Sequence, residues 1–353
     1  MRIMDILLIF VPITLALAYS GFEGSTVLFV LSLLAILPLA AKMGEATEEL
    51  AKIFGGHIGG LLNATFGNAA ELIIALLAIN RGLLDLVKAS IAGSIIGNLL
   101  FVLGLSIFVG GLRYKEQKFS AHIGSMNSTM LLIAMMSLMI PSMFHFVPTE
   151  HRGDDEKVLS ISVAALLILV YILSLVFSLK THEDLFRGGD SAHDKKHEKP
   201  IWSRNFAIAV LAVSTVALAL ISEVFVGQIE HVARDFGLTE LFIGAIIVAV
   251  IGNAAEHIAA VFFALKNDLD LSVNVTVGSS LQIALFVAPV AVLAGVLMGQ
   301  PMDLVFTPFE IVAVFASVLI VNEITADGKC NWFEGAQLVI MYLIVAVLFF
   351  FVR

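Results

Sequence analysis

The sequence Gly67-Asn68-Ala69-Ala70-Glu71 occurs a second time, as Gly252-Asn253-Ala254-Ala255-Glu256. Each copy lies midway along an apolar stretch long enough to cross a bilayer, so each places a carboxylate near the centre of the hydrocarbon. A charged side chain at that depth costs about 2.5–3.5 kcal/mol on insertion scales, and such residues usually serve a function. Because the same five residues recur, we predict that Glu71 and Glu256 are central to what this protein does.

The composition is that of an integral membrane protein. Of the 353 residues, 59% are hydrophobic and 14% are charged, whereas soluble domains carry about 25% charged residues. The net charge of −9 gives no reason to expect a nucleic-acid partner. The single cysteine, Cys330, excludes an intrachain disulfide and a cysteine-rich metal site, and we expect an inert thiol.

The apolar stretches predict an all-α polytopic membrane protein. About 20 apolar residues cross the ~30 Å hydrocarbon core. On this measure we predict eleven transmembrane helices, near residues 3–19, 25–41, 59–80, 84–112, 125–147, 158–180, 205–227, 239–265, 269–298, 303–322 and 333–352. The first stretch is similar to the apolar part of a secretory signal, but Asp5 offsets Arg2, so we expect an uncleaved helix.

The distribution of Lys and Arg predicts the orientation in the membrane. Fourteen lie on the side that holds the N-terminus and six on the opposite side. The excess predicts a cytoplasmic N-terminus and an external C-terminus, and the compact loops suit a prokaryotic inner membrane. The one long polar connection, residues 181–204, contains His182, His193 and His197. We interpret it as a solvated linker, with binding of a regulatory cation as the alternative.

An internal repeat determines the predicted domain organisation. Residues 67–104 align without a gap on residues 252–289, and 15 of the 38 pairs are identical, against roughly four expected by chance. Five span-to-span steps separate Glu71 from Glu256, so the second copy is predicted to be inverted. Inverted repeats of this kind build a substrate site at the bilayer midplane, with alternating access.

The chain is therefore expected to contain an extra N-terminal helix and two five-helix repeats. The predicted boundaries are 1–22 for the extra helix, 23–180 for the first repeat, 181–204 for the cytoplasmic linker and 205–353 for the second repeat.

The repeated motif has the chemistry of a hard-cation site. Glycine followed by asparagine is unfavourable within a helix, so we predict a break at Gly67-Asn68 or Gly252-Asn253. Carbonyl groups released by a break, together with a carboxylate, are oxygen ligands of the kind that Ca²⁺ binds. Neither motif region contains cysteine, which argues against copper or a thiolate zinc site.

Further polar residues are expected near the two glutamates. Candidate metal ligands besides the carboxylates are the amides and hydroxyls Asn68, Asn253, Ser94, Ser279, Asn98 and Gln282. Asn98 lies four residues after Ser94, and Gln282 three after Ser279, so each pair shares a helix face. The alternative for the two serines is a hydrogen bond within their own helix.

His257 directly follows Glu256 and is a candidate proton-binding group; a buried, hydrogen-bonded structural histidine is the alternative. A zinc protease would need His-Glu-x-x-His, but position 261 is valine. No enzyme is therefore predicted.

Charge balance predicts coupled exchange. Two facing carboxylates in a low-dielectric site are neutralised by one Ca²⁺ or by two protons, whereas the empty site carries two negative charges. Glu71 and Glu256 are thus predicted to bind either Ca²⁺ or protons, and the protein is expected to change sides readily when loaded and reluctantly when empty. This defines a Ca²⁺/H⁺ antiporter that needs no cofactor, because both ions are substrates.

These motifs resemble those of the cation/proton exchanger family within the calcium/cation antiporter superfamily. The resemblance rests on both Gly-Asn-Ala-Ala-Glu sequences, on Glu256-His257, and on the segments 93–98 and 278–282, and it covers essentially the whole chain. It implies a Ca²⁺/H⁺ antiporter whose partners are Ca²⁺, protons and the lipid bilayer, and it allows a homotrimer. It also implies that the candidate polar residues lie near the two glutamates.

The strongly acidic segment that some family members have between the repeats is absent, since residues 180–200 hold five basic and five acidic side chains. Regulation by an acidic helix is therefore not expected. The alternatives for function are a sodium/calcium exchanger of the same superfamily and a passive cation channel, in which the glutamates would form a selectivity ring.

Overall fold

The computed structural model of the chain describes residues 2–22, 24–149, 151–182 and 200–352. In this described part, seven helices are long and apolar enough to cross a membrane, and a bent pair raises the number to eight. Three shorter apolar helices accompany them, at Met4–Tyr19, Ala69–Asn80 and Thr129–Phe144. The chain is therefore an integral, multi-pass, helical membrane protein, as its composition predicts.

The chain folds into two compact units, each assembled from segments that are far apart in sequence. The first unit comprises Met1–Leu77 and Val170–Phe236, and the second comprises Ala78–Leu169 and Gly237–Arg353. Each unit therefore takes helices from both halves of the chain.

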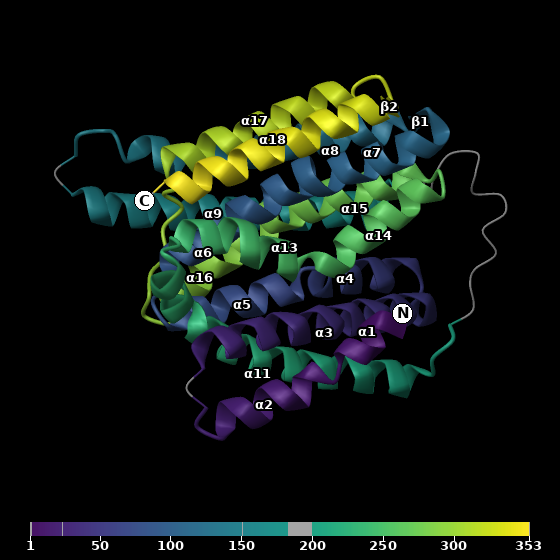
Figure 1. Cartoon of the computed structure of the whole chain (residues 1–353). Coiled ribbons are helices and arrows are strands. Elements are labelled where there is room, and N and C mark those ends of the chain that lie inside the picture. The colour runs from purple at the N-terminus through teal and green to yellow at the C-terminus, as the bar shows by residue number, and fades with distance from the viewer. Residues whose placement is uncertain (1, 23, 150, 183–199, 353) are drawn as a thin grey trace. The chain divides into compact units, whose positions relative to one another are not determined.

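The first unit is centred on one long helix. Its elements are α1 (Arg2–Leu7), α2 (Phe10–Tyr19), α3 (Ser25–Phe54), α4 (Gly56–Phe66), most of α5 (Ala69–Asn80), the end of α9 (Arg152–Val176), the π-helical segment η2 (Phe177–Thr181) and α11 (Arg204–Phe236). Helix α3 packs against α1, α2, α4 and α11. It lies alongside α11 (Figure 1), where the rings of Phe29 and Phe225 stack at 5.0 Å between centroids. Buried Glu49 on α3 accepts the N–H groups of Ile201 (2.6 Å) and Trp202 (2.9 Å), which holds the chain just before α11.

The second unit contains the remaining elements. They are the rest of α5 and α9 with α6 (Leu84–Ile96), η1 (Gly97–Val102), α7 (Leu103–Tyr114), β1 (Glu116–Lys118), α8 (Ala121–Phe144), α12 (Glu240–Phe242), η4 (Ile243–Val248), α13 (Ala249–Gly252), α14 (Ala254–Leu265), α15 (Leu269–Gln282), η5 (Ile283–Val287), α16 (Ala288–Leu297), α17 (Pro308–Thr325), β2 (Lys329–Asn331) and α18 (Trp332–Phe351). The core of this unit is the continuous helix α6-η1-α7. It packs against η4, α14, α15, α17 and α18 and is the most buried candidate span in the described part of the chain.

Two glycines allow α6 to approach η4 closely. A Cβ atom on Gly93 would overlap the backbone of Ala245, and one on Gly244 would meet the carbonyl of Leu86 at 2.6 Å. Small residues at such crossings let helix backbones approach each other in membranes. The crossing also brings Ser94, which follows Gly93, within 3.0 Å of the amide nitrogen of Asn253.

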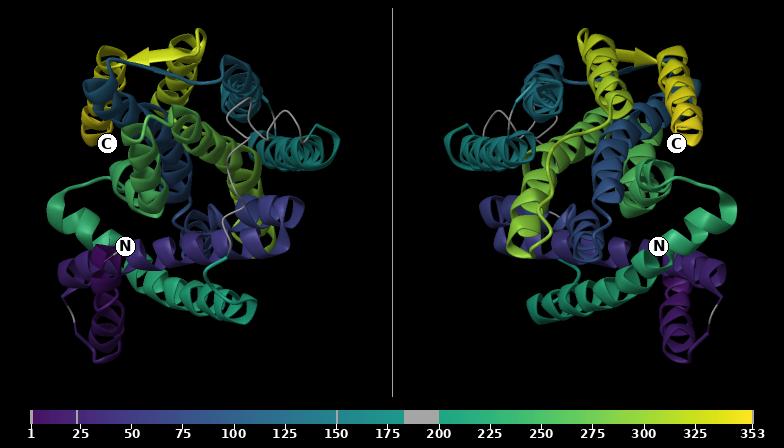
Figure 2. Two further views of the ribbon diagram at one scale, coloured as in Figure 1. Left: turned by 90° about the vertical axis from the view of Figure 1, so that its right-hand side faces the viewer. Right: turned by 90° about the vertical axis from the view of Figure 1, so that its left-hand side faces the viewer.

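One short antiparallel strand pair interrupts the helical fold. β1 pairs with β2, and Gln117 lies opposite Cys330 in the register. In Figure 2 the β2 arrow joins the neighbouring ends of α17 and α18. The sequence does not predict this pair, because three-residue strands are too short to show an alternating pattern.

Cys330 is buried in β2, outside the membrane-spanning helices, with 2% of its surface exposed. Burial raises the pKa of its thiol above the usual value, and the carboxylates of Glu334 and Asp327 raise this pKa further. Because the thiolate is the reactive form, we expect a maleimide to label the native protein at neutral pH about tenfold more slowly than the denatured chain. Timed labelling followed by mass spectrometry measures both rates, and equal rates would contradict the burial.

Candidate cation site

Both copies of the repeated motif break their helices at the asparagine. In the first unit, α4 ends at Phe66 and α5 begins at Ala69. In the second unit, α13 ends at Gly252 and α14 begins at Ala254, and the two parts of the span are bent by 60° (Figure 1). The predicted break is therefore confirmed in both copies.

Each break places a glutamate in the first turn of the helix that follows it. Glu71 is the third residue of α5, and Glu256 is the third residue of α14. The N-terminal end of a helix carries a partial positive charge, so it favours a carboxylate in this position. In the first unit, Asn68 and Glu71 are both buried, with 1% and 8% exposure.

In the second unit, five of the predicted site residues form one polar cluster. Its members are Ser94, Asn98, Asn253, His257 and Ser279, all of them buried. Their hydrogen bonds form a continuous chain. The Nε2 of His257 contacts Asn98 Oδ1 (3.1 Å), Asn98 Nδ2 donates to Ser279 Oγ (3.1 Å), Ser279 Oγ donates to Asn253 Oδ1 (3.4 Å), and Asn253 Nδ2 donates to Ser94 Oγ (3.0 Å).

Asn253 has a structural role at the break itself. Its amide nitrogen also donates to the carbonyl of Ala249, at 2.9 Å. That carbonyl also accepts the backbone N–H of Asn253, at the longer distance of 3.4 Å. The side chain of Asn253 therefore adds a second, shorter hydrogen bond to this carbonyl at the break.

Glu256 adjoins this cluster. Its carboxylate lies beside the Ser279 hydroxyl, which has one hydrogen to donate either to this carboxylate or to Asn253 Oδ1. Within the described residues, the second carboxylate oxygen, Oε2, is buried and has no hydrogen-bond partner. An unpartnered buried carboxylate oxygen is costly, so this atom is suited to receive a proton or a cation.

The remaining predicted ligand, Gln282, is half-buried at the end of α15, directly before η5. Asn98 itself lies in η1. Three π-helical segments, η1, η4 and η5, thus occur on the spans that carry the cluster, and such segments are frequent at functional sites.

No group of three or more His, Cys, Asp or Glu side chains is placed to hold a metal ion in the described part of the chain. A cation at the polar cluster would therefore be held by a carboxylate with amide, hydroxyl or backbone oxygens. These are the hard ligands that Ca²⁺ prefers.

A further buried carboxylate that the sequence motifs do not indicate is Glu310, in the first turn of α17. Its Oε2 accepts both the N–H and the hydroxyl of Thr307, each at 2.8 Å. Together with Pro308 at the helix start, this capping box explains why α17 begins at residue 308 and not near 303 as predicted. Glu310 is therefore a capping residue, and a Thr three residues before a Glu was the signal that could have found it.

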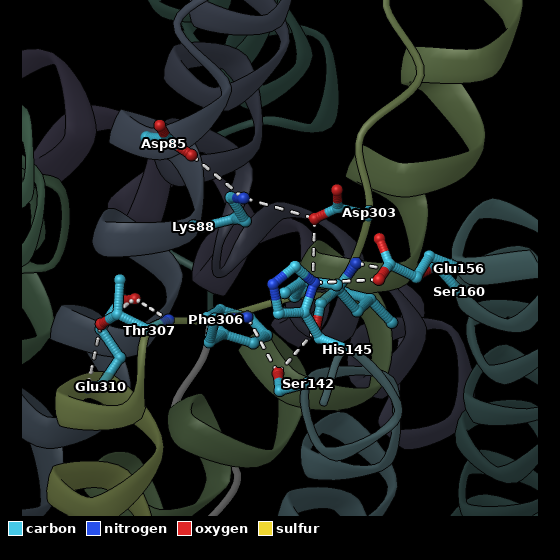
Figure 3. A network of polar contacts seen from close by, with 12 residues as sticks. Asp85, Lys88, Ser142, His145, Glu156, Ser160, Asp303, Phe306, Thr307 and Glu310 are labelled. Carbon is cyan, nitrogen blue, oxygen red and sulfur yellow. Dashed lines mark hydrogen bonds and ion pairs between the residues drawn. The ribbon is translucent and has the colours of Figure 1, made fainter. Parts of the chain in front are cut away.

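The segment before α17 is held by polar side chains (Figure 3). Ser142 Oγ donates to the Leu304 carbonyl (3.0 Å) and accepts the N–H of Phe306 (2.9 Å), while Ser160 Oγ accepts the N–H of Leu304 (3.0 Å). Nearby, the ammonium group of Lys88 lies between Asp85 and Asp303 (Figure 3). The two serines thus satisfy backbone polar groups of this non-helical segment.

Of the linker histidines, His182 is the last described residue before residue 200. Its ring stacks on Phe177 at 4.1 Å between centroids, and its Nδ1 contacts the Thr181 hydroxyl at 2.9 Å. His193 and His197 lie outside the described residues.

The fold and the polar cluster define a class of protein, namely polytopic helical membrane proteins with a buried carboxylate and amides at broken helices. The family described as "Sodium/calcium exchanger protein" matches residues 24–180 and 206–351. A Ca²⁺/H⁺ antiporter of Aphanothece halophytica is 47% identical, over 98% of this chain and 95% of its own length. The Ca²⁺/H⁺ antiporter ChaA of Bacillus subtilis (strain 168) is also 47% identical, with 92% of each chain covered.

Among solved structures, native YfkE aligns with a TM-score of 0.86 and 42% identity, covering 99% of this chain and 100% of YfkE. The chain belongs to the Ca²⁺/H⁺ antiporter family within the sodium/calcium exchanger superfamily. It is thus a member of a transporter family and not an enzyme, and the family resemblance inferred from the motifs is confirmed.

Proposed function

We propose that this protein exchanges Ca²⁺ for H⁺ across a membrane by alternating access, with Glu71 and Glu256 binding either Ca²⁺ or protons. The observation that carries the proposal is Glu256 Oε2, which is buried without a partner beside the hydroxyls and amides of the polar cluster. The close relatives named as Ca²⁺/H⁺ antiporters support the choice of ions.

Charge balance explains why the two fluxes are coupled. One Ca²⁺ neutralises two carboxylates, and so do two protons, whereas the empty site retains two negative charges in a low-dielectric environment. The loaded forms cross the occluded state at lower cost than the empty form. Exchange is therefore favoured over one-way leakage.

The other polar residues receive supporting roles in this proposal. Asn68, Asn253, Ser94, Ser279, Asn98 and Gln282 supply neutral oxygen atoms around the cation. His257 accepts or passes on protons next to Glu256, and its hydrogen bond to Asn98 links it to the cluster.

The proposed topology has eleven spans. The seven long helices, the bent pair and the three shorter apolar helices would together supply them. The two five-helix repeats would be inverted relative to each other, with residues 1–22 as the extra helix, the N-terminus in the cytoplasm and the C-terminus outside. A bacterial inner membrane is the proposed location, and a homotrimer is compatible with the proposal.

Reconstituted vesicles test the function directly. With purified protein in proteoliposomes, an outward proton gradient is expected to drive ⁴⁵Ca²⁺ uptake that saturates with Ca²⁺. A sodium gradient without a pH gradient should drive none. Uptake driven by sodium alone would identify a sodium/calcium exchanger, and non-saturating flux without countertransport would identify a channel; either result would overturn the proposal.

A further inference from the structure

Helix α14, which carries Glu256 in its first turn, is anchored at its opposite end by a left-handed cap. Asn267 adopts a positive φ of 63°. The N–H of Asn267 donates to Ala264 O (3.0 Å), and the N–H of Asp268 donates to Phe263 O (3.0 Å). This is the Schellman pattern, in which asparagine is one of the few residues other than glycine that tolerate the left-handed position. The pattern still leaves the final carbonyl, that of Leu265, to find a partner elsewhere.

That partner comes from residues 113–120, which comprise the last two residues of α7 and the connection to α8; we call this segment the brace. The hydroxyl of Tyr114 donates to Leu265 O at 3.0 Å, and the guanidinium of Arg113 donates to the same oxygen at 3.3 Å. At the other end of the brace, the N–H of Ser120 donates to Asp270 Oδ1, at 2.6 Å, in the first turn of α15. The brace therefore spans the turn between α14 and α15.

Gln117 is the buried centre of the brace, with 1% exposure. Its Nε2 donates to Ala264 O at 2.9 Å and to Asn267 Oδ1 at 3.1 Å. Both acceptors are oxygens, so the amide nitrogen must face them. Gly110 on α7 leaves the necessary room, because a Cβ atom at that position would overlap the Gln117 amide.

Because α14 is long, a small change in its tilt at this anchor displaces Glu256 at the other end. Eight residues separate Glu256 from Ala264, which is about 12 Å along a helix. A tilt of about 5° at the anchor therefore moves Glu256 by about 1 Å, which is large compared with the tolerance of a cation site.

We propose that Gln117 is a positioning residue for the antiport reaction, because its amide fixes the tilt of α14 and so holds Glu256 beside Ser279. This inference rests on the proposed function. It assigns to residues 113–120 a task that the motif residues themselves cannot perform, since the motif anchors only the N-terminal end of α14.

The test compares Gln117→Met with Gln337→Met. Methionine keeps the length of the side chain but cannot donate a hydrogen bond, and Gln337 is exposed on α18. In proton-driven ⁴⁵Ca²⁺ uptake, Gln117→Met is expected to raise the apparent KM for Ca²⁺ about fivefold while Vmax per folded protein changes less than twofold. Gln337→Met should behave as the parent does.

Tyr114→Phe is the milder second variant, because it removes only one hydroxyl; it is expected to raise KM about twofold. If Gln117→Met fails to fold, the KM of Tyr114→Phe tests the proposal in its place. If Gln117 has a purely structural role, Vmax falls in proportion to the amount of folded protein while KM stays constant. That result, or an unchanged KM in both variants, would overturn the proposal. If the parent protein itself shows no proton-driven uptake, the proposed function fails instead.

A double-mutant cycle shows whether the effect passes through Glu256. Equilibrium ⁴⁵Ca²⁺ binding is measured for Gln117→Met in the parent background and in the Glu256→Gln background. We expect Gln117→Met to weaken binding about fivefold in the parent and to have no further effect once Glu256 is replaced. Equal losses in both backgrounds would contradict positioning through Glu256.

Discussion

Glu256→Gln is expected to reduce proton-driven Ca²⁺ uptake at least about 100-fold, which is close to complete loss. Glutamine keeps the shape of the side chain and the bond with Ser279, but it can neither neutralise a divalent cation nor exchange a proton. Glu71→Gln is expected to have the same effect, because charge balance requires both carboxylates. Uptake of ⁴⁵Ca²⁺ into proteoliposomes under a proton gradient measures both variants.

Glu310→Gln is the matched control for these two substitutions. Glu310 is also a buried glutamate in the first turn of a helix, with 3% exposure. Its carboxylate serves a capping box, in which glutamine also functions, so Glu310→Gln should keep uptake within about twofold of the parent. If Glu256→Gln or Glu71→Gln transported as well as this control, a shared carboxylate site would be excluded.

Gly93→Ala is expected to destabilise the protein by about 1–3 kcal/mol, although it adds only a methyl group. That methyl group would overlap the backbone of Ala245 in η4, which cannot rotate away as a side chain could. Separating α6 from η4 would also stretch the hydrogen bond between Ser94 and Asn253. Thermal unfolding in detergent measures the loss of stability, and uptake assays should show a parallel loss of transport.

Gly278→Ala, at the equivalent position of the second repeat copy, is expected to stabilise the protein, the opposite of the effect of Gly93→Ala. A Cβ atom on Gly278 has no heavy atom within 4 Å. Alanine should therefore stabilise α15 by roughly 0.5–1 kcal/mol through its higher helix propensity. Equal destabilisation by Gly93→Ala and Gly278→Ala would show that the close crossing of α6 and η4 does not decide the effect.

The sequence was sufficient to predict several features of the candidate site. Glycine and asparagine in mid-span predicted both helix breaks, because these residues are poor helix formers. The family resemblance implied that Ser94, Asn98, Asn253 and Ser279 lie near the two glutamates, and the structure joins these four side chains by hydrogen bonds. Gln282, predicted with the same reasoning, is half-buried at the end of α15.

Other features could not have been read from the sequence. Gly93 and Gly278 are identical in the alignment of the two copies, yet only Gly93 meets a facing backbone. Gln117 carries no motif, and its acceptors lie 147 and 150 residues away along the chain. Its environment depends on the packing of distant elements, for which local patterns carry no signal.

The order of the residues was enough to show a multi-pass membrane protein with two related motifs, each with an acid within an apolar stretch. This is possible because the length of apolar stretches, the placement of charges and the repetition of residues can be read directly from the order of the residues. The three-dimensional packing was needed to show which polar residues hydrogen-bond to one another, which of the two aligned glycines faces a backbone and which distant side chain contacts the end of α14. The physical reason is that close packing and hydrogen-bond geometry depend on sub-ångström distances between segments that are far apart in the chain.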